Sequence, residues 1–403
     1  MKLAIFFLDA IRFQDLNLTV TPFLGKMAAQ GTSGPLETLL AYEGLAATLF
    51  TGTFPSEHGI WTRYYRDPEG SPFKWIRPLV PILSRIDSRS PRAGKPLRYG
   101  LMRLSNSMAG ISYFPGIDDV PLGELAHMGV SLKRNLFEPG CFGRTPSLFD
   151  ILRMSNISFH YFDHGVFDSD SDVQQRAISS RSTPDVSVVR FVDLDTASHT
   201  YGLGTPTMLE SLKRTDLLVG RLVSEWRRRN PDLTVLCFAD HGMVPVENTI
   251  NVEKSLREAG FHPSHDFGMF LDSTMARFWG ESATLSRIRT HLEGIDSGNL
   301  LSQDDLSRYH LPISPYWGDL IYLSSPGVVI SPNFFDRAGK VRAMHGYDPA
   351  TPGLDTIAIL DDPQRNKPNR LDHVRMIDIL PTALDLLGLH IPSYCHGKSM
   401  VNA

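Results

Sequence analysis

Six aspartate and histidine residues are the part of this sequence whose types and spacing are best suited to chemistry. Four of them form close pairs: Asp195 with His199 four residues later, and Asp240 with His241. Carboxylates and imidazoles are ligands that proteins use for Zn²⁺, and carboxylate-rich sets also suit Mn²⁺. Brought together in space, the set would hold two divalent cations; its members are Asp9, Asp195, His199, Asp240, His241 and His345.

Three apolar runs with the length and composition of buried strands end at three of these acids. Residues 3–8, 186–194 and 234–239 form the runs, and an aspartate directly follows each one. The carboxyl ends of parallel strands meet at one edge of a sheet, where open α/β folds bind their ligands. We therefore expect Asp9, Asp195 and Asp240 at one such edge. His199 is expected on a turn of small residues that follows Asp195.

Helical patterns alternate with the strand patterns along the chain. This alternation is typical of an α/β fold with a central, mainly parallel sheet and helices on both faces. Residues 296–325 are predicted to be irregular. Helices are predicted at residues 22–30, 43–50, 146–154, 206–229, 284–292 and 374–387, and further strands at residues 157–161, 269–278 and 355–360.

Residues 62–143 are richer in proline, glycine and serine than the rest and show little periodicity. Long irregular segments in compact domains often serve as functional lids. We therefore predict a single domain, residues 1–403, in which residues 62–143 form an inserted cap that sets the choice of substrate.

Composition narrows the classes of partner. The 403 residues are 42% hydrophobic and 21% charged with a net charge of -4, so no overall positive field favours nucleic acid or an acidic membrane. The first apolar run meets an acid at Asp9, which is too early for a signal peptide or a membrane span. Three dispersed cysteines indicate no disulfide framework. We expect a cytoplasmic protein whose partner is a small molecule, neither a nucleic-acid polymer nor a membrane.

Taken singly, these residues have ordinary explanations. An aspartate at a strand end is more often a turn former or a helix cap, and a lone histidine is more often a surface or satisfied core residue. Several strand-end positions with metal-type ligands, in Asp-His-Gly and Asp-x-x-x-His contexts, are hard to obtain by chance.

Five segments resemble the alkaline phosphatase superfamily, in particular its type I phosphodiesterase and nucleotide pyrophosphatase branch. Residues 238–243, Phe-Ala-Asp-His-Gly-Met, are similar to the Asp-His-Gly-Met signature of the superfamily. Residues 193–202 resemble the Asp-x-x-x-His-x-Tyr-Gly segment of the branch, and residues 51–60 its Thr-Gly-x-x-Pro-x-x-His-Gly run. Residues 344–347 and 375–382 resemble its later metal-histidine and helical segments. The resemblance implies an alkaline phosphatase-like fold and a hydrolase of phosphate esters or diesters.

The resemblance also implies how the six ligands divide between two cations, expected to be Zn²⁺ or else Mn²⁺. Asp195, His199 and His345 would hold one, and the other would be held by Asp9, Asp240 and His241. Two such metals clamp the attacking and leaving oxygens of an in-line displacement at phosphorus.

The sequence departs from the family at the nucleophile. The family carries a Ser, Thr or modified Cys nine positions before the Thr of the Thr-Gly pair, at the N-terminus of a helix that lowers its pKa. Counting back from Thr51 reaches Tyr42, and the next residue is Glu43. Neither residue is an ordinary nucleophile for this chemistry.

Several interpretations of this position stay open. Glu43 could bind the second metal and act as a general base on a metal-bound water, which would give hydrolysis without a covalent intermediate. Tyr42 could attack as a metal-bound phenolate. Alternatively, the site performs an altered group transfer in a biosynthetic pathway, or only binds its ligand. We predict a two-metal hydrolase of a small phosphate-containing molecule.

Overall fold

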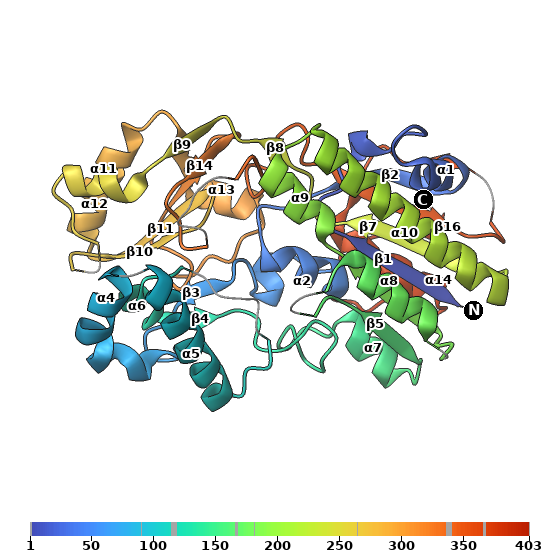
Figure 1. Cartoon of the computed structure of the whole chain (residues 1–403), viewed down its shortest axis with the longest axis horizontal. Coiled ribbons are helices and arrows are strands. Elements are labelled where there is room, and N and C mark those ends of the chain that lie inside the picture. The colour runs from blue at the N-terminus through green and yellow to red at the C-terminus, as the bar shows by residue number, and fades with distance from the viewer. Residues whose placement is uncertain are drawn as a thin grey trace.

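A mixed sheet of eight strands forms the centre of the larger part of the molecule, on the right in Figure 1, in a computed structural model. Four neighbouring strands of this sheet run parallel, and the strand next to them is antiparallel to both of its neighbours. The structure describes residues 2–89, 91–113, 119–165, 168–180, 182–263, 265–335, 341–365 and 368–402. In spatial order the strands are β17 (Asn369–Arg370), β2 (Thr32–Glu37), β16 (Thr356–Asp361), β7 (Thr234–Ala239), β1 (Leu3–Leu8), β6 (Val186–Phe191) and β5 (Phe159–Phe162), with β18 (Val374–Arg375) also paired to β2.

Helices cover both faces of this sheet, because its central strands are apolar on both sides. On β1, the alternate residues Ala4 and Phe6 pack into one hydrophobic cluster, and Ile5 and Phe7 into another. The predicted α/β fold with a mainly parallel sheet is confirmed. Helices α1 (Pro22–Gln30), α8 (Asp170–Ser179) and α10 (Pro206–Arg229) lie on the first face, and α2 (Glu43–Thr51), α7 (Leu148–Met154) and α14 (Ile379–Leu386) on the second.

A second, antiparallel sheet of four strands lies beside the first and has its own hydrophobic cluster (Figure 1). The cluster joins residues of the 62–143 segment, such as Tyr64 and Leu125, to residues such as Phe270 and Tyr322 far along the chain. The sheet consists of β10 (Gly268–Leu271), β11 (Met275–Trp279), β13 (Leu320–Ser324) and β12 (Gly298–Leu300); around it lie β3 (Tyr64–Arg66), β4 (Met128–Val130), α4 (Val80–Arg89), α5 (Pro91–Ala109), α6 (Leu122–Leu125), α11 (Val252–Glu258) and α12 (Ser282–Glu293).

Shorter elements accompany these strands and helices. They are α3 (Pro55–His58), α9 (Asp193–Tyr201), β8 (Val244–Pro245), β9 (Asn248–Ile250), α13 (Gln303–Arg308), β14 (Val328–Ile330), β15 (Ala343–Met344) and the 3-10 helices η1 (Phe13–Asp15), η2 (Lys74–Leu79), η3 (Met376–Asp378) and η4 (Met400–Asn402). Within the described residues, no helix has both the length and the apolar character needed to cross a membrane.

The structure corrects several element predictions. The strand expected at 186–194 ends at Phe191, and helix α9 follows it. The strand expected at 269–278 is two strands, because Asp272 turns the chain with a backbone hydrogen bond to Met275. The irregular stretch at 296–325 contains two strands and a helix, and the 62–143 segment contains two long helices. The helix expected at 374–387 begins with a short strand that pairs with β2.

Candidate metal centre

The carboxyl ends of β1 and β7 place three of the six predicted ligands side by side. Asp9 and Asp240 follow these paired parallel strands at the same edge of the sheet. Nε2 of His241 lies 3.2 Å from Oδ1 of Asp9 and 3.8 Å from Oδ1 of Asp240. All three side chains are buried. The edge therefore concentrates two carboxylates and an imidazole in a space with little water.

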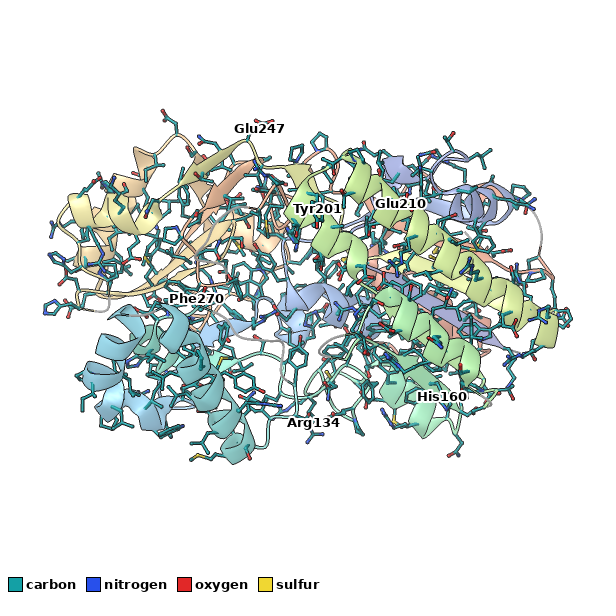
Figure 2. All side chains as sticks on the ribbon, viewed as in Figure 1. Arg134, His160, Tyr201, Glu210, Glu247 and Phe270 are labelled. Carbon is teal, nitrogen blue, oxygen red and sulfur yellow. The ribbon has the colours of Figure 1, made fainter. Side chains whose placement is uncertain are left out.

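Asp195 and His199 reach the same region from α9, whose C-terminal Tyr201 is labelled in Figure 2. The turn predicted between them is wrong, because both residues lie within the helix. A spacing of four residues puts their side chains on one helix face, with Nε2 of His199 3.2 Å from Oδ1 of Asp195. Nδ1 of His199 lies 2.8 Å from the carbonyl oxygen of Ala343, which ties the helix to β15.

His345 completes the cluster from the segment after β15. This strand pairs with β8, which follows His241 by three residues. The rings of His345 and His241 stack with centroids 3.6 Å apart and planes 9° apart, and the His199 ring lies 5.4 Å from that of His345. The structure thus gathers all six predicted ligands, from four segments far apart in the sequence.

Within the cluster, two sets of three residues have ligand atoms within 4.8 Å of one another. Asp9, Asp240 and His241 form one set, as expected from the resemblance. The second set is Asp195, His241 and His345, so His241 belongs to both sets, while His199 is paired with Asp195 alone. The predicted assignment of His199 to a cation stays a prediction.

The donor atoms of the second set fit a cation. Nδ1 of His345 is buried and has no hydrogen-bond partner among the described residues. Oδ1 of Asp195 is also buried, and its contact with His199 does not have hydrogen-bond geometry. A buried polar atom without a partner costs free energy, which a bound metal ion would recover.

Burial and neighbouring charges together set the pKa values in the cluster. Burial raises the pKa of Asp240 to about 7, and the neighbouring Asp9 carboxylate adds to this effect. Burial alone would lower the pKa of His241, but the carboxylates of Asp240 and Asp9 raise it to about 10. Burial, with His241 and His199 close by, holds the pKa of His345 well below its usual value, so this imidazole is neutral. A neutral imidazole beside clustered carboxylates is the protonation state that metal ligation requires.

Arg190 is a residue of the site that the sequence analysis missed. It lies on β6, where Nη2 is 3.3 Å from Oδ2 of Asp9, and its guanidinium lies over the Phe7 ring at 5.0 Å. Burial would lower the pKa of Arg190, but the carboxylates of Asp163 and Asp9 raise it well above the usual value. A single arginine inside an otherwise apolar strand is a signal that could have identified it.

Asp170 braces the start of α9 and was also missed. Its carboxylate accepts hydrogen bonds from the backbone amides of Val192 (2.8 Å) and Asp193 (3.2 Å), and lies 2.7 Å from Nε2 of His164. His164, Asp170 and Asp193 also satisfy the distance criterion for a metal site, but the bonds to the helix already use the Asp170 carboxylate. We interpret this group as a support that fixes the helix carrying Asp195 and His199.

Tyr42 stands directly before α2 and is held by hydrogen bonds. Its hydroxyl is 2.6 Å from Oγ1 of Thr274, and the Thr274 hydroxyl donates to the carbonyl oxygen of Gly346 at 2.6 Å. A threonine hydroxyl has one proton to give, so the Tyr42 phenol must be the donor to Thr274. Burial, with Asp272 nearby, also raises the pKa of Tyr42 well above its usual value.

Glu43 is the first residue of α2, where a negative charge is favourable beside the helix N-terminus. Its Oε1 accepts a 2.7 Å charged hydrogen bond from Nε of Arg63. The helix start is fixed as well, because the backbone amides of Tyr42 and Gly44 both donate to the carbonyl oxygen of Trp61 at 3.1 Å. Glu43 therefore presents a carboxylate of defined orientation directly beside the position where the resemblance implies a nucleophile.

Comparison with protein families gives a match over residues 3–348 to the model described as type I phosphodiesterase/nucleotide pyrophosphatase. The match includes all six predicted metal ligands and the Tyr42–Glu43 position. A comparison of the sequence with curated proteins finds no match.

Solved structures of one protein type are similar along nearly the whole chain. The human ectonucleotide pyrophosphatase/phosphodiesterase 5 superposes with a TM-score of 0.73 at 14% identity, over 100% of this chain and 98% of that one. The murine protein gives 0.71 at 13% identity, over 100% and 99% of the two chains. An inactive threonine-to-alanine variant of the murine protein, in complex with AMP, gives 0.71 at 14% identity over 97% and 96%. At such identities the similarity shows the fold.

Proposed function

Because this chain belongs to the type I phosphodiesterase/nucleotide pyrophosphatase family, we propose that its metal centre hydrolyses a phosphodiester or pyrophosphate bond of a small molecule with two divalent cations. Membership of the family makes the chain a hydrolase of this type, and members of the family use two divalent metal ions. The observation that carries the proposal is the convergence of six ligands, two of them with buried donor atoms that lack partners.

Asp9, Asp240 and His241 would hold one cation, and Asp195, His345 and His199 the other, with His241 close enough to serve either. The mixed carboxylate and imidazole set favours Zn²⁺ over Mg²⁺. When bound, the two ions supply Lewis-acid stabilisation of the charge that develops on phosphate oxygens.

Glu43 is the residue that we propose as general base. Its carboxylate can accept the proton of an attacking water, and its bond to Arg63 fixes the direction in which it does so. The reaction would then be direct hydrolysis, in which water oxygen bonds to phosphorus while the bond to the leaving oxygen breaks. No covalent phosphoenzyme forms in this scheme.

Tyr42 is proposed to position His345 and not to attack phosphorus. Its phenol proton is committed to Thr274, and its ring contacts the His345 ring edge-to-face at a centroid distance of 5.6 Å. Its hydroxyl also fills the space above Gly346, where an added Cβ would come within 2.6 Å of the Tyr42 oxygen. Losing the phenol proton would break the hydrogen bond to Thr274 at a buried site.

Arg190 is proposed to bind a nonbridging oxygen of the substrate phosphate. It lies beside Asp9 at the edge where the cations would be, and its buried Nε has no hydrogen-bond partner in the part of the chain that the structure describes. A guanidinium suits phosphate because its N–H groups match two oxygens at once. AMP is the ligand in one of the similar structures, and a nucleotide-type substrate is consistent with these charges.

The experiment that tests the proposal compares hydrolysis of thymidine 5′-(p-nitrophenyl phosphate) by the Zn²⁺-loaded protein and by two variants. Glu43→Gln should lower kcat by roughly 10²- to 10⁴-fold, the range for loss of a general base. Glu210→Gln makes the same chemical change on the exposed surface of α10 (Figure 2) and should leave the rate unchanged. Single-turnover reactions stopped with acid should contain no thymidine 5′-phosphoryl group bound covalently to protein. Recovery of that group on Tyr42, with p-nitrophenol released, would overturn the proposed role of Glu43.

A further inference from the structure

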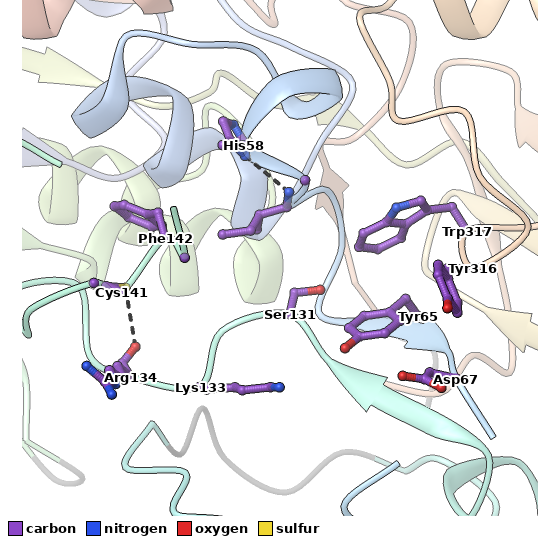
Figure 3. A pocket seen from close by; sticks show the side chains of 14 residues that line it. His58, Tyr65, Asp67, Ser131, Lys133, Arg134, Cys141, Phe142, Tyr316 and Trp317 are labelled. Atoms are coloured by element: carbon purple, nitrogen blue, oxygen red, sulfur yellow. Dashed lines mark hydrogen bonds between the residues drawn. The ribbon is translucent and has the colours of Figure 1, made fainter. Parts of the chain in front are cut away.

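A cavity of about 700 Å³ opens below α3, apart from the metal centre (Figure 3). None of the six predicted metal ligands lines it. Its walls are formed by the end of α3 and the turn after it, by β3 and the residue that follows it, by the 131–143 segment, and by residues 316–317 in the loop between α13 and β13. Its volume lies within the range of small-molecule sites in proteins.

One side of the cavity is aromatic. Tyr65 meets Tyr316 edge-to-face at 6.0 Å and Trp317 at 5.4 Å between ring centroids. Tyr316 is 51% exposed, so its ring offers an open face, whereas Trp317 is 6% exposed and is held from behind by Trp61. A fixed group of rings with one accessible member is suited to stacking against a planar ring.

The other side carries positive charge. Figure 3 shows Lys133 and Arg134 on the side of the cavity opposite Tyr316 and Trp317. In the described part of the chain, the Lys133 ammonium has no ion pair, and the Arg134 guanidinium donates to the carbonyl oxygen of Pro139. Asp67 also lines the cavity, but its Oδ1 already accepts the backbone amide of Gly70 at 2.8 Å. This hydrogen bond leaves the negative charge of Asp67 in place, so the lining carries two cationic side chains and one carboxylate, with a net positive charge.

Part of the remaining surface is glycine backbone that a ligand can approach closely. Gly59 and Gly143 line the cavity with φ values of 73° and 68°, and a Cβ added at either would meet no atom within 4 Å. Both positions favour glycine because of their positive φ. The space that their missing side chains leave is open to the cavity.

We propose that this cavity is a second binding site, for an aromatic ring joined to an anionic group. The ring would stack on the open face of Tyr316, and the anion would pair with the Lys133 ammonium. An apolar ring alone would leave the two cations unused, and an inorganic anion alone would leave the aromatic wall bare. Both parts of the ligand are therefore needed for binding.

Hydrogen bonds connect the lining of this cavity to the segment that holds Glu43. Ser131 donates to the carbonyl oxygen of Thr62, next to Arg63, which holds Glu43. The carbonyl oxygen of Lys133 accepts the backbone amide of Ser112 at 2.9 Å. A ligand in the cavity would thus contact the segment that positions the proposed general base, although the proposal itself does not depend on the catalytic role of Glu43.

Isothermal titration with AMP as the probe tests the proposal, using Asp240→Asn as the background so that the metal centre is impaired. We expect AMP to bind this background, while adenosine and inorganic phosphate each bind at least about tenfold more weakly. Lys133→Ala and Tyr316→Ala, both at exposed positions, should each weaken the binding of AMP about tenfold or more. Lys213→Ala removes the same charge from the exposed surface of α10 and should have no effect.

Three results would overturn the proposal. They are no binding of AMP to the Asp240→Asn background, equal binding of phosphate and AMP, and binding of AMP that Lys133→Ala and Tyr316→Ala leave unchanged. The last result would place AMP elsewhere, including the metal centre. Thermal melting of each variant without ligand verifies that the surface substitutions leave the fold intact. Because the titration measures binding in a catalytically impaired protein, its outcome is separate from that of the hydrolysis experiment.

Discussion

The phenol of Tyr42 donates a 2.6 Å hydrogen bond to Oγ1 of Thr274, and the Thr274 hydroxyl donates one of 2.6 Å to the carbonyl oxygen of Gly346. Thr274 lies in the turn between two strands of the second sheet, whereas Gly346 directly follows the predicted ligand His345. Thr274 of the second sheet is therefore hydrogen-bonded both to Tyr42, at the unusual nucleophile position, and to the segment that carries His345.

Substitutions at Thr274 should affect metal binding through this chain of hydrogen bonds. Thr274→Val has nearly the same shape but removes the hydroxyl, so the Gly346 carbonyl and the Tyr42 phenol both lose a buried partner. We expect roughly tenfold weaker binding of Zn²⁺, measured by competition with a chromogenic chelator. Thr274→Ser keeps the hydroxyl and is the matched control. Equal Zn²⁺ affinity in all three proteins would show that the chain of hydrogen bonds does not position His345.

Tyr42→Phe distinguishes a positioning role from a nucleophilic one. It keeps the ring beside His345 and removes only the hydroxyl, so we expect kcat to fall by less than about tenfold, as for one lost hydrogen bond. Removal of a nucleophile should lower kcat by several orders of magnitude. Steady-state hydrolysis of the chromogenic phosphodiester at saturating Zn²⁺ measures the difference, and a loss beyond 10³-fold would favour attack by the phenolate.

Replacing Arg190 should weaken recognition of the substrate phosphate. Arg190→Met removes the charge but keeps an apolar stem over Phe7, and we expect kcat/KM to fall about ten- to a hundredfold, as for a lost charged hydrogen bond. Arg221→Met is the matched control because Arg221 is exposed on α10. Unchanged kcat/KM in the Arg190 variant would remove this residue from the proposed mechanism.

His58 should make the fold sensitive to acid. Its Nδ1 accepts the Ile60 amide at 3.1 Å and its Nε2 lies 3.0 Å from Oγ1 of Thr48, an arrangement of the neutral ring. Burial lowers the pKa of His58 from the ordinary 6.5 to about 3. Between those values the unfolded state binds more protons, so stability is full above pH 6.5 and is lost as pH falls toward 3.

The expected loss from His58 is about 2 kcal/mol between pH 7 and pH 5, at 1.36 kcal/mol per pKa unit. Urea unfolding at the two pH values measures it. His58→Asn keeps an acceptor for the Ile60 amide but does not titrate. The difference in unfolding free energy between pH 7 and pH 5 should therefore be smaller in this variant than in the unmodified protein, by about 2 kcal/mol. The same change in both proteins would mean that His58 is not the source of the acid sensitivity.

The central strands and the candidate metal ligands could be predicted from local patterns in the sequence, because each depends on a short segment. The apolar run of β1 and the Asp240-His241 pair need no knowledge of the rest of the chain. The second sheet was not predicted, since its strands depend on partners such as Tyr64 and Phe270 that lie about two hundred residues apart. The helix carrying Asp195 was predicted as part strand and part turn, because its small residues have weak preferences and its start is fixed by Asp170.

The residues around the nucleophile position show the same limit. Tyr42 and Glu43 were identified by counting along the sequence, but their partners Thr274 and Arg63 could not be, because those contacts are formed only in the folded chain. It is these contacts that favour Glu43 over Tyr42 as the reactive group.

The most direct test of the two-metal centre is the number of metal ions per chain, measured by mass spectrometry after dialysis against Zn²⁺, together with phosphodiester hydrolysis of the same samples. We predict close to two ions and activity for the unmodified protein, and at most one ion with activity lost for Asp240→Asn, whose carboxamide is a poorer ligand. Asp232→Asn, in the turn before β7, should behave as the unmodified protein. Fewer than one ion in the unmodified protein, or full hydrolysis after removal of both ions, would contradict the account.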